Sequence, residues 1–141
     1  MRSLLCLGLT LASCGAPAPE APGEGATGQA LNPCAVQDGV PVEDGLKAVG
    51  TEPFWAAEIQ GRCVTYKTPE NQQGSRIWSH VHSEADRRIW EGALDGRQFQ
   101  LAVRPVPECS DGMSDRRYPL EAVLRVNGET RRGCAERLAA P

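Results

Sequence analysis

Apolar and polar residues alternate along most of the chain from Pro53 onward, in short stretches separated by turn signals. In residues 98–104, Phe99, Leu101 and Val103 occupy every second position, and two glutamines and an arginine occur at the positions between and beside them. Successive side chains of a strand point to opposite faces of its sheet, so this alternation predicts a strand with one buried face. Similar patterns predict strands at 54–59, 63–66, 76–83, 87–94, 122–126 and 131–135, and a weaker one at 36–42.

Glycine-containing turn signals separate these segments. The Asp-Gly pair at 95–96 and the Asn-Gly pair at 127–128 are typical of two-residue hairpin turns, in which both central residues need a positive φ. A Gln-Gly pair at 60–61 marks a third turn, and no segment keeps a helical period over three turns. We therefore predict an all-β domain, a small antiparallel meander of seven or eight strands that closes into a barrel or sandwich. Tight turns favour an up-and-down barrel, whose interior is filled by side chains or holds one small ligand.

Residues 1–15 do not follow this pattern. Arg2 supplies a positive charge, an apolar stretch runs from Leu4 to Leu11, and small residues then precede Cys14. This order predicts a secretory signal peptide at residues 1–13, which is removed by cleavage. The apolar stretch is much shorter than the roughly 20 residues that a membrane-spanning helix needs, which argues against a transmembrane anchor. An ordinary cleaved signal, with Cys14 nearby by chance, is the remaining alternative.

The sequence Leu-Ala-Ser-Cys at 11–14 resembles the lipobox of bacterial lipoproteins. The resemblance implies that Cys14 receives a diacylglyceryl thioether and becomes the new N-terminus after cleavage, so that the protein is anchored to a membrane. One acyl chain binds a membrane only marginally, and stable attachment takes two or more chains. Gly15, rather than Asp, resembles the pattern that is sorted to the outer membrane, which implies its periplasmic face in a Gram-negative cell.

Composition divides the rest of the chain. Residues 15–30 contain only Gly, Ala, Pro, Glu, Thr and Gln, none of which can build a core, so we expect a disordered tether there. The predicted organisation is a lipidated cysteine with a flexible linker at 14–33, followed by a single disulfide-stapled β domain at 34–141. The chain has 15 basic and 18 acidic side chains, which argues against nucleic acid as a partner, because phosphate binding needs clustered positive charge.

Four cysteines fall in the predicted domain: Cys34, Cys63, Cys109 and Cys134. An even number of cysteines in an exported domain predicts two disulfides, for which three connectivities exist. We favour Cys34–Cys63 together with Cys109–Cys134, because each pair joins neighbouring segments of the chain. A zinc site built from all four cysteines is the alternative, and the chain lacks the CxxC pairs that are typical of one.

Short motifs stand out from the generic strands: GTEPFW at 50–55, CSDGMSD at 109–115, YP at 118–119 and GC at 133–134. Together they resemble an uncharacterised family of bacterial envelope lipoproteins, over about residues 47–136. The resemblance implies export and a disulfide between Cys109 and Cys134, but no particular activity. In size and strand pattern the chain is also remotely similar to membrane-bound lysozyme inhibitors and to META-type domains, which makes a lysozyme one protein partner to consider.

The segment 109–115 is rich in side-chain oxygen atoms, with Asp111, Ser114 and Asp115 within five residues. An EF-hand calcium loop that began at Asp111 would need an oxygen ligand at its third position, Gly at its sixth and Glu at its twelfth. The sequence has Met, Arg and Ala at those positions, which excludes an EF-hand. Two interpretations remain: a turn in which Ser110 or Asp111 caps exposed backbone N–H groups, or a polar rim that meets a ligand or a protein partner.

The GTEPFW motif poses a similar choice. Pro53 cannot donate a hydrogen bond to a strand ladder and predicts a strand start or edge. Trp55 is most simply a core residue whose indole N–H needs a partner, whereas together with Glu52 it would form a pocket wall. The candidate ligand-binding residues are therefore Glu52, Trp55, Asp111, Ser114, Asp115 and Tyr118.

His80 and His82 are the only histidines of the chain. On a strand they would share a face with Glu84, and histidines at this spacing can chelate zinc or copper. A solvated strand face is the simpler interpretation. These three residues are therefore weak metal candidates, and we expect no metal and no cofactor.

Patterns typical of catalytic sites are not found. The sequence has neither a G-x-S-x-G nor an H-E-x-x-H motif, and disulfide pairing would leave no free thiol in the domain. We therefore expect a lipid-anchored cell-envelope protein that acts as a binding or inhibitor-like module and is not an enzyme. The alternatives are a structural envelope component without a ligand, and a metal-binding envelope protein that uses His80 and His82.

Overall fold

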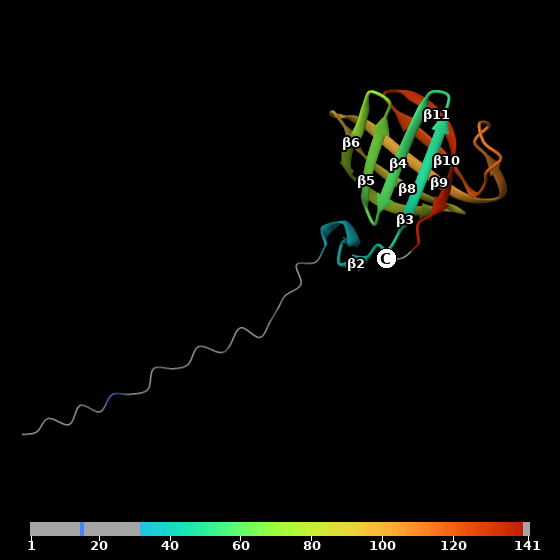
Figure 1. The fold of residues 1–141 in the computed structure, drawn as a ribbon. Helices are drawn as coiled ribbons and strands as arrows, with labels where there is room; N and C mark the ends of the chain where they lie inside the picture. The colour runs from blue at the N-terminus through green and yellow to red at the C-terminus, as the bar shows by residue number, and fades with distance from the viewer. Residues whose placement is uncertain (1–14, 16–31, 140–141) are drawn as a thin grey trace, which may run out of the picture.

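The computed structural model describes Gly15 and residues 32–139 of the chain. The predicted signal peptide at 1–13, the lipidation at Cys14 and most of the linker at 14–33 lie outside these residues. The described part is almost entirely β-structure, and its helical structure is the 3₁₀ helix η1 (Pro33–Ala35) (Figure 1). No helix of the described part is long and apolar enough to cross a membrane.

The strands form two sheets that differ greatly in size. Two short strands, β1 (Val36–Gln37) and β2 (Val40–Pro41), make a separate hairpin. Nine strands form one antiparallel sheet: β3 (Gly45–Thr51), β4 (Phe54–Gln60), β5 (Cys63–Thr68), β6 (Asn71–Trp78), β7 (His80–Glu84), β8 (Arg87–Leu94), β9 (Arg97–Ser110), β10 (Arg117–Val126) and β11 (Glu129–Arg137). The predicted all-β fold is confirmed.

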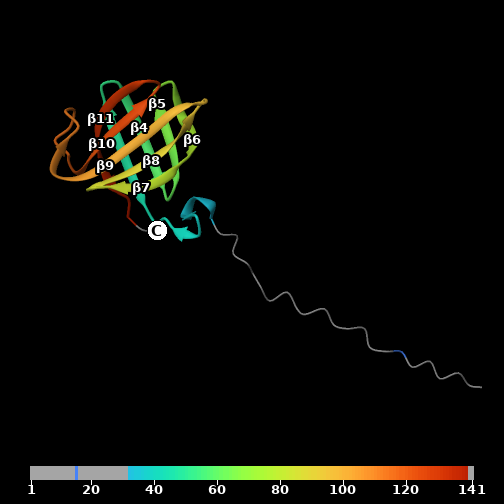
Figure 2. The same cartoon turned by 180° about the vertical axis from the view of Figure 1, so that it is seen from behind.

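The large sheet follows the chain as a meander and curls round until its first strand meets its last. Its order is β6-β5-β4-β3-β11-β10-β9-β8-β7, in which β3 pairs with β11. The two edge strands, β6 and β7, are consecutive in the chain and are joined directly through Ser79. Figures 1 and 2 show the resulting barrel-like form from opposite sides.

Three predicted elements need correction. The segment 76–83, predicted as one strand, is divided at Ser79, because β6 pairs with β5 whereas β7 pairs with β8. The weak strand at 36–42 is two very short strands around a turn in which Asp38 and Gly39 both have positive φ. The prediction missed β3, where small residues weaken the alternation. The strand number is therefore larger than the seven or eight expected.

Side chains satisfy backbone groups at the junction of β6 and β7 and on β7 itself. Ser79 is fully buried, and its backbone N–H and its hydroxyl both donate to the carbonyl of Arg62. In return, the side-chain Nε of Arg62 donates to the carbonyl of Ser79 at 2.9 Å. On β7, the amide of Gln37 pairs with both backbone groups of Val81, at 2.8 Å to the carbonyl and 2.6 Å from the N–H. Unpaired strand edges invite association with other chains. Gln37 therefore acts as a substitute for a neighbouring strand.

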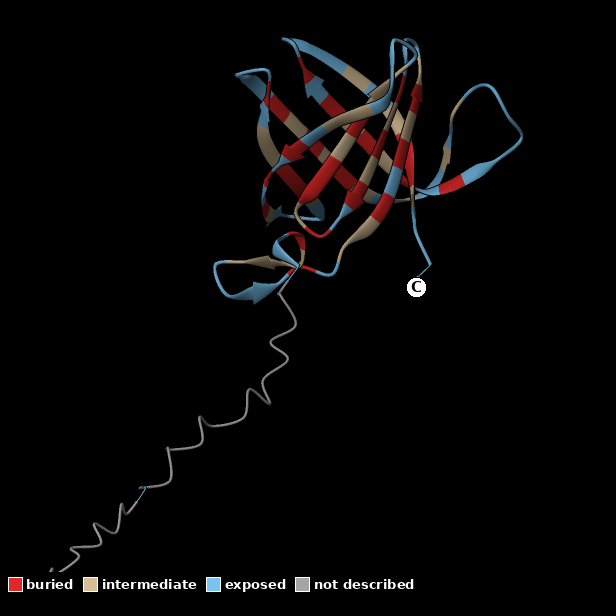
Figure 3. Cartoon of the chain, turned by 60° about the vertical axis from the view of Figure 1, so that its left-hand side comes forward, coloured by how far each residue is buried: buried red, intermediate tan, exposed pale blue. Residues whose placement is uncertain are grey.

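The core fills the interior of the curved sheet (Figure 3). Trp90 and Phe99 are the largest fully buried side chains. The indole N–H of Trp90 donates to the carbonyl of Gly61 at 2.9 Å, which satisfies its one polar atom. Gly61 has a positive φ, and a Cβ there would lie 1.9 Å from the carbonyl oxygen of Cys34, so this turn requires glycine.

Both favoured disulfides are present. Cys34 pairs with Cys63 and Cys109 pairs with Cys134, with Cα–Cα distances of 5.2 and 5.7 Å. This pairing excludes the alternative zinc site, because every one of the four sulfurs is bonded to another. The first disulfide ties η1 and the small β1–β2 hairpin to the start of β5. The second ties the β9–β10 hairpin to β11.

Candidate functional site

The β9–β10 hairpin extends beyond the rest of the sheet. Its ladder runs regularly as far as the pair Leu120–Pro105 and resumes at Tyr118–Cys109 after a shift in register. Prolines at 105, 107 and 119 lack the backbone N–H that a ladder needs, which explains the irregularity. We call residues 106–119 the arm, and Figures 1 and 3 show it projecting from the sheet.

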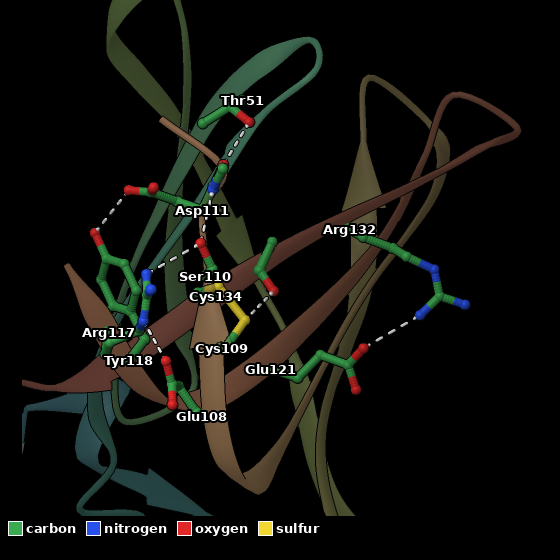
Figure 4. The surroundings of a disulfide bond; sticks show 12 residues. Thr51, Glu108, Cys109, Ser110, Asp111, Arg117, Tyr118, Glu121, Arg132 and Cys134 are labelled. Atoms are coloured by element: carbon green, nitrogen blue, oxygen red, sulfur yellow. Dashed lines mark hydrogen bonds and ion pairs between the residues drawn. A yellow bond between two sulfur atoms is a disulfide. The ribbon is translucent and has the colours of Figure 1, made fainter. Parts of the chain in front are cut away.

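Two of the contacts that fasten the arm to β11 and β3 are shown in Figure 4. The first is the disulfide between Cys109 and the fully buried Cys134 of β11. The second is a hydrogen bond of 2.9 Å, which the Thr51 hydroxyl at the end of β3 donates to the carbonyl of Asp111. Thr51 belongs to GTEPFW and Asp111 to CSDGMSD, so two motifs 60 residues apart lie side by side.

Asp111 organises the tip of the arm. Its Oδ1 accepts the backbone N–H groups of Met113 and Ser114, both at 2.9 Å, and its Oδ2 accepts the Ser114 hydroxyl at 2.9 Å. These donors hold the pKa of Asp111 below its usual range, and the N–H of Met113 has the largest effect. The interpretation of Asp111 as a turn cap is confirmed, and its carboxylate is engaged within the arm.

Tyr118 lies at the base of this tip and is buried. Its hydroxyl is 3.4 Å from Oδ2 of Asp111, and burial, followed by the charge of Asp111, raises the pKa of Tyr118. The guanidinium of Arg116 stacks over the Tyr118 ring at 5.2 Å and pairs with Glu136 of β11 at 2.6 Å. Tyr118 therefore supports the arm from within, and its ring is not offered to a ligand.

The turn between β3 and β4 and the start of β4 place Trp55 inside the protein and its predecessors outside. Glu52 is exposed, and Phe54 is 53% exposed. Trp55 is only 4% exposed and belongs to the core, so the core interpretation of this residue is confirmed. Its ring lies against Gly50, where a Cβ would be 2.0 Å from Nε1. That buried Nε1 has no hydrogen-bond partner within the described part of the chain.

The candidate residues do not converge on one pocket. A hollow of about 200 Å³ between the arm and the sheet is lined by Gly50, Thr51, Cys109, Ser110, Asp111, Glu121, Arg132 and Gly133. Trp55 lines a different, apolar hollow of about 250 Å³, together with Phe54, Pro69 and neighbouring residues of β4 to β6. Glu52, Ser114 and Asp115 line neither hollow and face solvent. The structure thus joins the two motifs through the hydrogen bond between Thr51 and Asp111. The acidic side chains of Glu52 and Asp115 stay exposed.

The metal candidates lie elsewhere, on the edge strand β7. His80 and His82 have ring centroids 5.9 Å apart, and Glu84 is exposed at the end of the strand. No group of three or more His, Cys, Asp or Glu side chains that could hold a metal ion occurs in residues 32–139. The two histidines therefore do not have a third ligand of these types in place.

The sequence-based candidates omitted Phe54 and Met113. Met113, at the tip of the arm, is 66% exposed, more than any other large hydrophobic residue of the described part. Strand parity would have identified Phe54, because a core Trp55 places its neighbour on the opposite face. No local signal singles out Met113, because its exposure depends on how the arm is fastened.

These contacts produce a projecting loop that is held in one shape and carries apolar and acidic side chains. Such an arrangement is suited to contact with another molecule. No protein-family model, curated protein or solved structure matches this chain.

Proposed function

We propose that the chain is an exported lipoprotein of the bacterial cell envelope, anchored through lipid on Cys14, whose β domain binds a protein partner. The lipobox resemblance at 11–14 and the short apolar segment before it support the anchor. The two disulfides fit an oxidising compartment outside the cytoplasm. In a Gram-negative cell the proposed location is the periplasmic face of the outer membrane.

The observation that carries the binding role is the arm. A disulfide at its base, the Thr51 hydrogen bond and the Asp111 network hold it in place, although most of its residues are exposed. Binding by a loop that is already ordered avoids much of the entropy cost of fixing it at the interface. Ordered loops on a rigid scaffold are also where binding residues concentrate.

The tip surface, as we define it, consists of Glu52, Phe54, Met113, Ser114 and Asp115. Its two segments are neighbours because Thr51 and Asp111 are hydrogen-bonded. Phe54 and Met113 supply exposed apolar area, and a methionine adapts its shape to a partner. Glu52 and Asp115 add carboxylates beside them. A mixture of apolar and charged side chains is typical of protein–protein contacts.

The most concrete version of this role is lysozyme inhibition. In it, the tip of the arm enters the substrate cleft of a lysozyme and blocks it. The remote similarity to membrane-bound lysozyme inhibitors in size and strand pattern supports this version by analogy of fold alone. A structural envelope component without a ligand is the competing role.

The test compares the wild-type protein with Met113→Ser/Asp115→Ser in pull-down and activity assays with lysozymes of several types. We expect the wild-type protein to inhibit at least one type at micromolar concentration and the double variant to lose most of this effect. Val40→Ser is the matched control, because Val40 is 63% exposed on the remote hairpin strand β2. If the wild-type protein inhibits none of the lysozymes, the inhibitor version is wrong. If the double variant inhibits as strongly as the wild-type protein, the tip surface is not the binding site.

A further inference from the structure

A third hollow lies on the sheet face opposite the core. It has a volume of about 400 Å³ and is lined mainly by residues of β8 to β11. In the register of the sheet, Ile89 pairs with Ala102, which pairs with Val123. These three residues have the parity opposite to the core residues Trp90, Leu101 and Leu124, so they form a row on the outside.

This outer row is apolar, whereas the exposed face of an antiparallel sheet ordinarily carries polar residues. Ile89 is only 4% exposed although it is not part of the core cluster. Ala102 and Val123 are half-buried. The floor of the groove is therefore apolar, and Ala102 and Val123 leave part of their surface exposed in it.

The walls of the groove are rich in arginine. Arg87, Arg104, Arg125 and Arg132 line it, against the two carboxylates of Glu84 and Glu121. The groove thus has an excess of positive charge in a chain whose formal net charge is −3. This local concentration of guanidinium groups contrasts with the acidic balance of the whole chain.

Glu121 positions two of these arginines. Its Oε2 accepts from Arg104 Nε at 2.7 Å, and its Oε1 accepts from Arg132 at 3.2 Å (Figure 4 shows the second contact). One carboxylate therefore holds guanidinium groups from β9 and β11 at fixed positions on either side of β10. Guanidinium groups held in this way bind phosphate or carboxylate oxygens in a bidentate manner.

We propose that this groove binds a small organic oxyanion, in which a phosphate or carboxylate group is carried on an apolar body. The oxyanion lies among Arg87, Arg104, Arg125 and Arg132, and the apolar body lies on Ile89, Ala102 and Val123. A volume of about 400 Å³ is in the range of small-ligand sites. This site is separate from the tip surface and does not depend on a protein partner.

The experiment titrates the purified, disulfide-bonded protein with butyl phosphate, butyrate, inorganic phosphate and butanol, followed by NMR shifts of backbone amides. We expect saturable shifts at Ala102 and Val123 with butyl phosphate or butyrate. The preferred headgroup is the one that binds more tightly. Inorganic phosphate should bind more weakly than butyl phosphate, and butanol should not bind. No saturable shift with either butyl anion up to about 10 mM would overturn the proposal.

Variants separate the two parts of the site. Arg87→Ala/Arg125→Ala should raise the dissociation constant of the butyl anion about tenfold, because each exposed ion pair adds a small amount. Val123→Ala should weaken the binding of the butyl anion and leave that of inorganic phosphate unchanged, because it removes only apolar atoms. Arg97→Ala is the control, since Arg97 is exposed on β9 but does not line the groove. An unchanged affinity in the double arginine variant, or an equal loss in Arg97→Ala, would contradict the assignment.

Discussion

At the scale of single residues, Asp111 links the ionisation of one carboxyl group to the shape of the arm. Its carboxylate accepts four hydrogen bonds, two from backbone N–H groups and two from the hydroxyls of Ser114 and Tyr118, and these donors keep its pKa below the usual value. Protonation would replace an acceptor of four hydrogen bonds by a poorer one. The hydrogen bonds that hold the tip of the arm should therefore weaken as the pH falls through this lowered pKa.

The first prediction concerns this response. A carboxyl group with a lowered folded-state pKa stabilises the fold fully above its ordinary pKa of 3.8, and the stabilisation is lost as the pH falls through the lowered value. We therefore expect the amide signals of Met113 and Ser114 to move in acid, with a midpoint below pH 3.8. NMR over this range measures the effect. Asp111→Asn should remove the transition; the same transition in that variant would show that another group causes it.

The second prediction concerns the packing of Trp55. A Cβ at Gly50 would lie 2.0 Å from the indole Nε1, so Gly50→Ala forces the ring or the strand to move. We expect a loss of roughly 1–3 kcal/mol in the free energy of unfolding, measured by urea denaturation. Gly45→Ala is the control on the same strand, because its Cβ would meet its nearest neighbour at 3.9 Å. Equal losses in both variants would argue against the close contact at Trp55.

At the scale of elements, the Cys109–Cys134 disulfide decides where the arm lies. The bond spans 25 residues, and the chain-entropy model assigns it about 3.5 kcal/mol. We expect Cys109→Ser/Cys134→Ser to lower the free energy of unfolding by a few kcal/mol and to weaken binding through the tip surface. Chemical denaturation and the lysozyme assay measure the two effects.

The matched control for this variant is Cys34→Ser/Cys63→Ser, which opens a span of 29 residues at the other disulfide. Its stability loss should be similar in size because the two spans are similar. Binding through the tip surface should nevertheless persist wherever the protein stays folded. Equal losses of binding in both double variants would mean that binding through the tip surface does not depend specifically on the Cys109–Cys134 disulfide.

The edge of β7 gives a further prediction at this scale. Gln37→Ala leaves the N–H and carbonyl of Val81 without the partners that the structure gives them. We expect the free energy of unfolding to fall by about 1–3 kcal/mol and the protein to self-associate more readily. Thermal unfolding and light scattering measure these effects. Gln73→Ala, an exposed position on β6, should change neither of them.

The strands themselves were largely predictable from alternation, because one buried face and one solvated face impose a period of two. The hairpin turns were predictable as well, since Asp95, Gly96, Asn127 and Gly128 all have the expected positive φ. The break at Ser79 was not. This break exists because β6 and β7 pair with different neighbouring strands, and the local sequence pattern does not specify which strands pair.

At the scale of the whole molecule, the anchor is the main prediction. Cys14→Ser should move the protein from the membrane fraction to the soluble fraction, because the lipid attachment site is lost. Cys6→Ser is the control, since Cys6 falls within the predicted signal peptide and is removed with it. Cell fractionation followed by immunoblotting measures the distribution. A Cys14→Ser variant that stays with the membrane would contradict lipid anchoring.

The sequence alone determined the fold class and the two disulfides of this protein, and it supports the expectation of export. These properties depend on composition, on short-range periodicity and on cysteines that are close along the chain. It also picked out GTEPFW and CSDGMSD, but not what they do for each other. Only the tertiary structure decided that Thr51 holds Asp111, that Tyr118 is inside, and that an arginine-lined groove exists on the outer sheet face. The reason is that these arrangements depend on strand register and on contacts between distant segments, which no local pattern specifies.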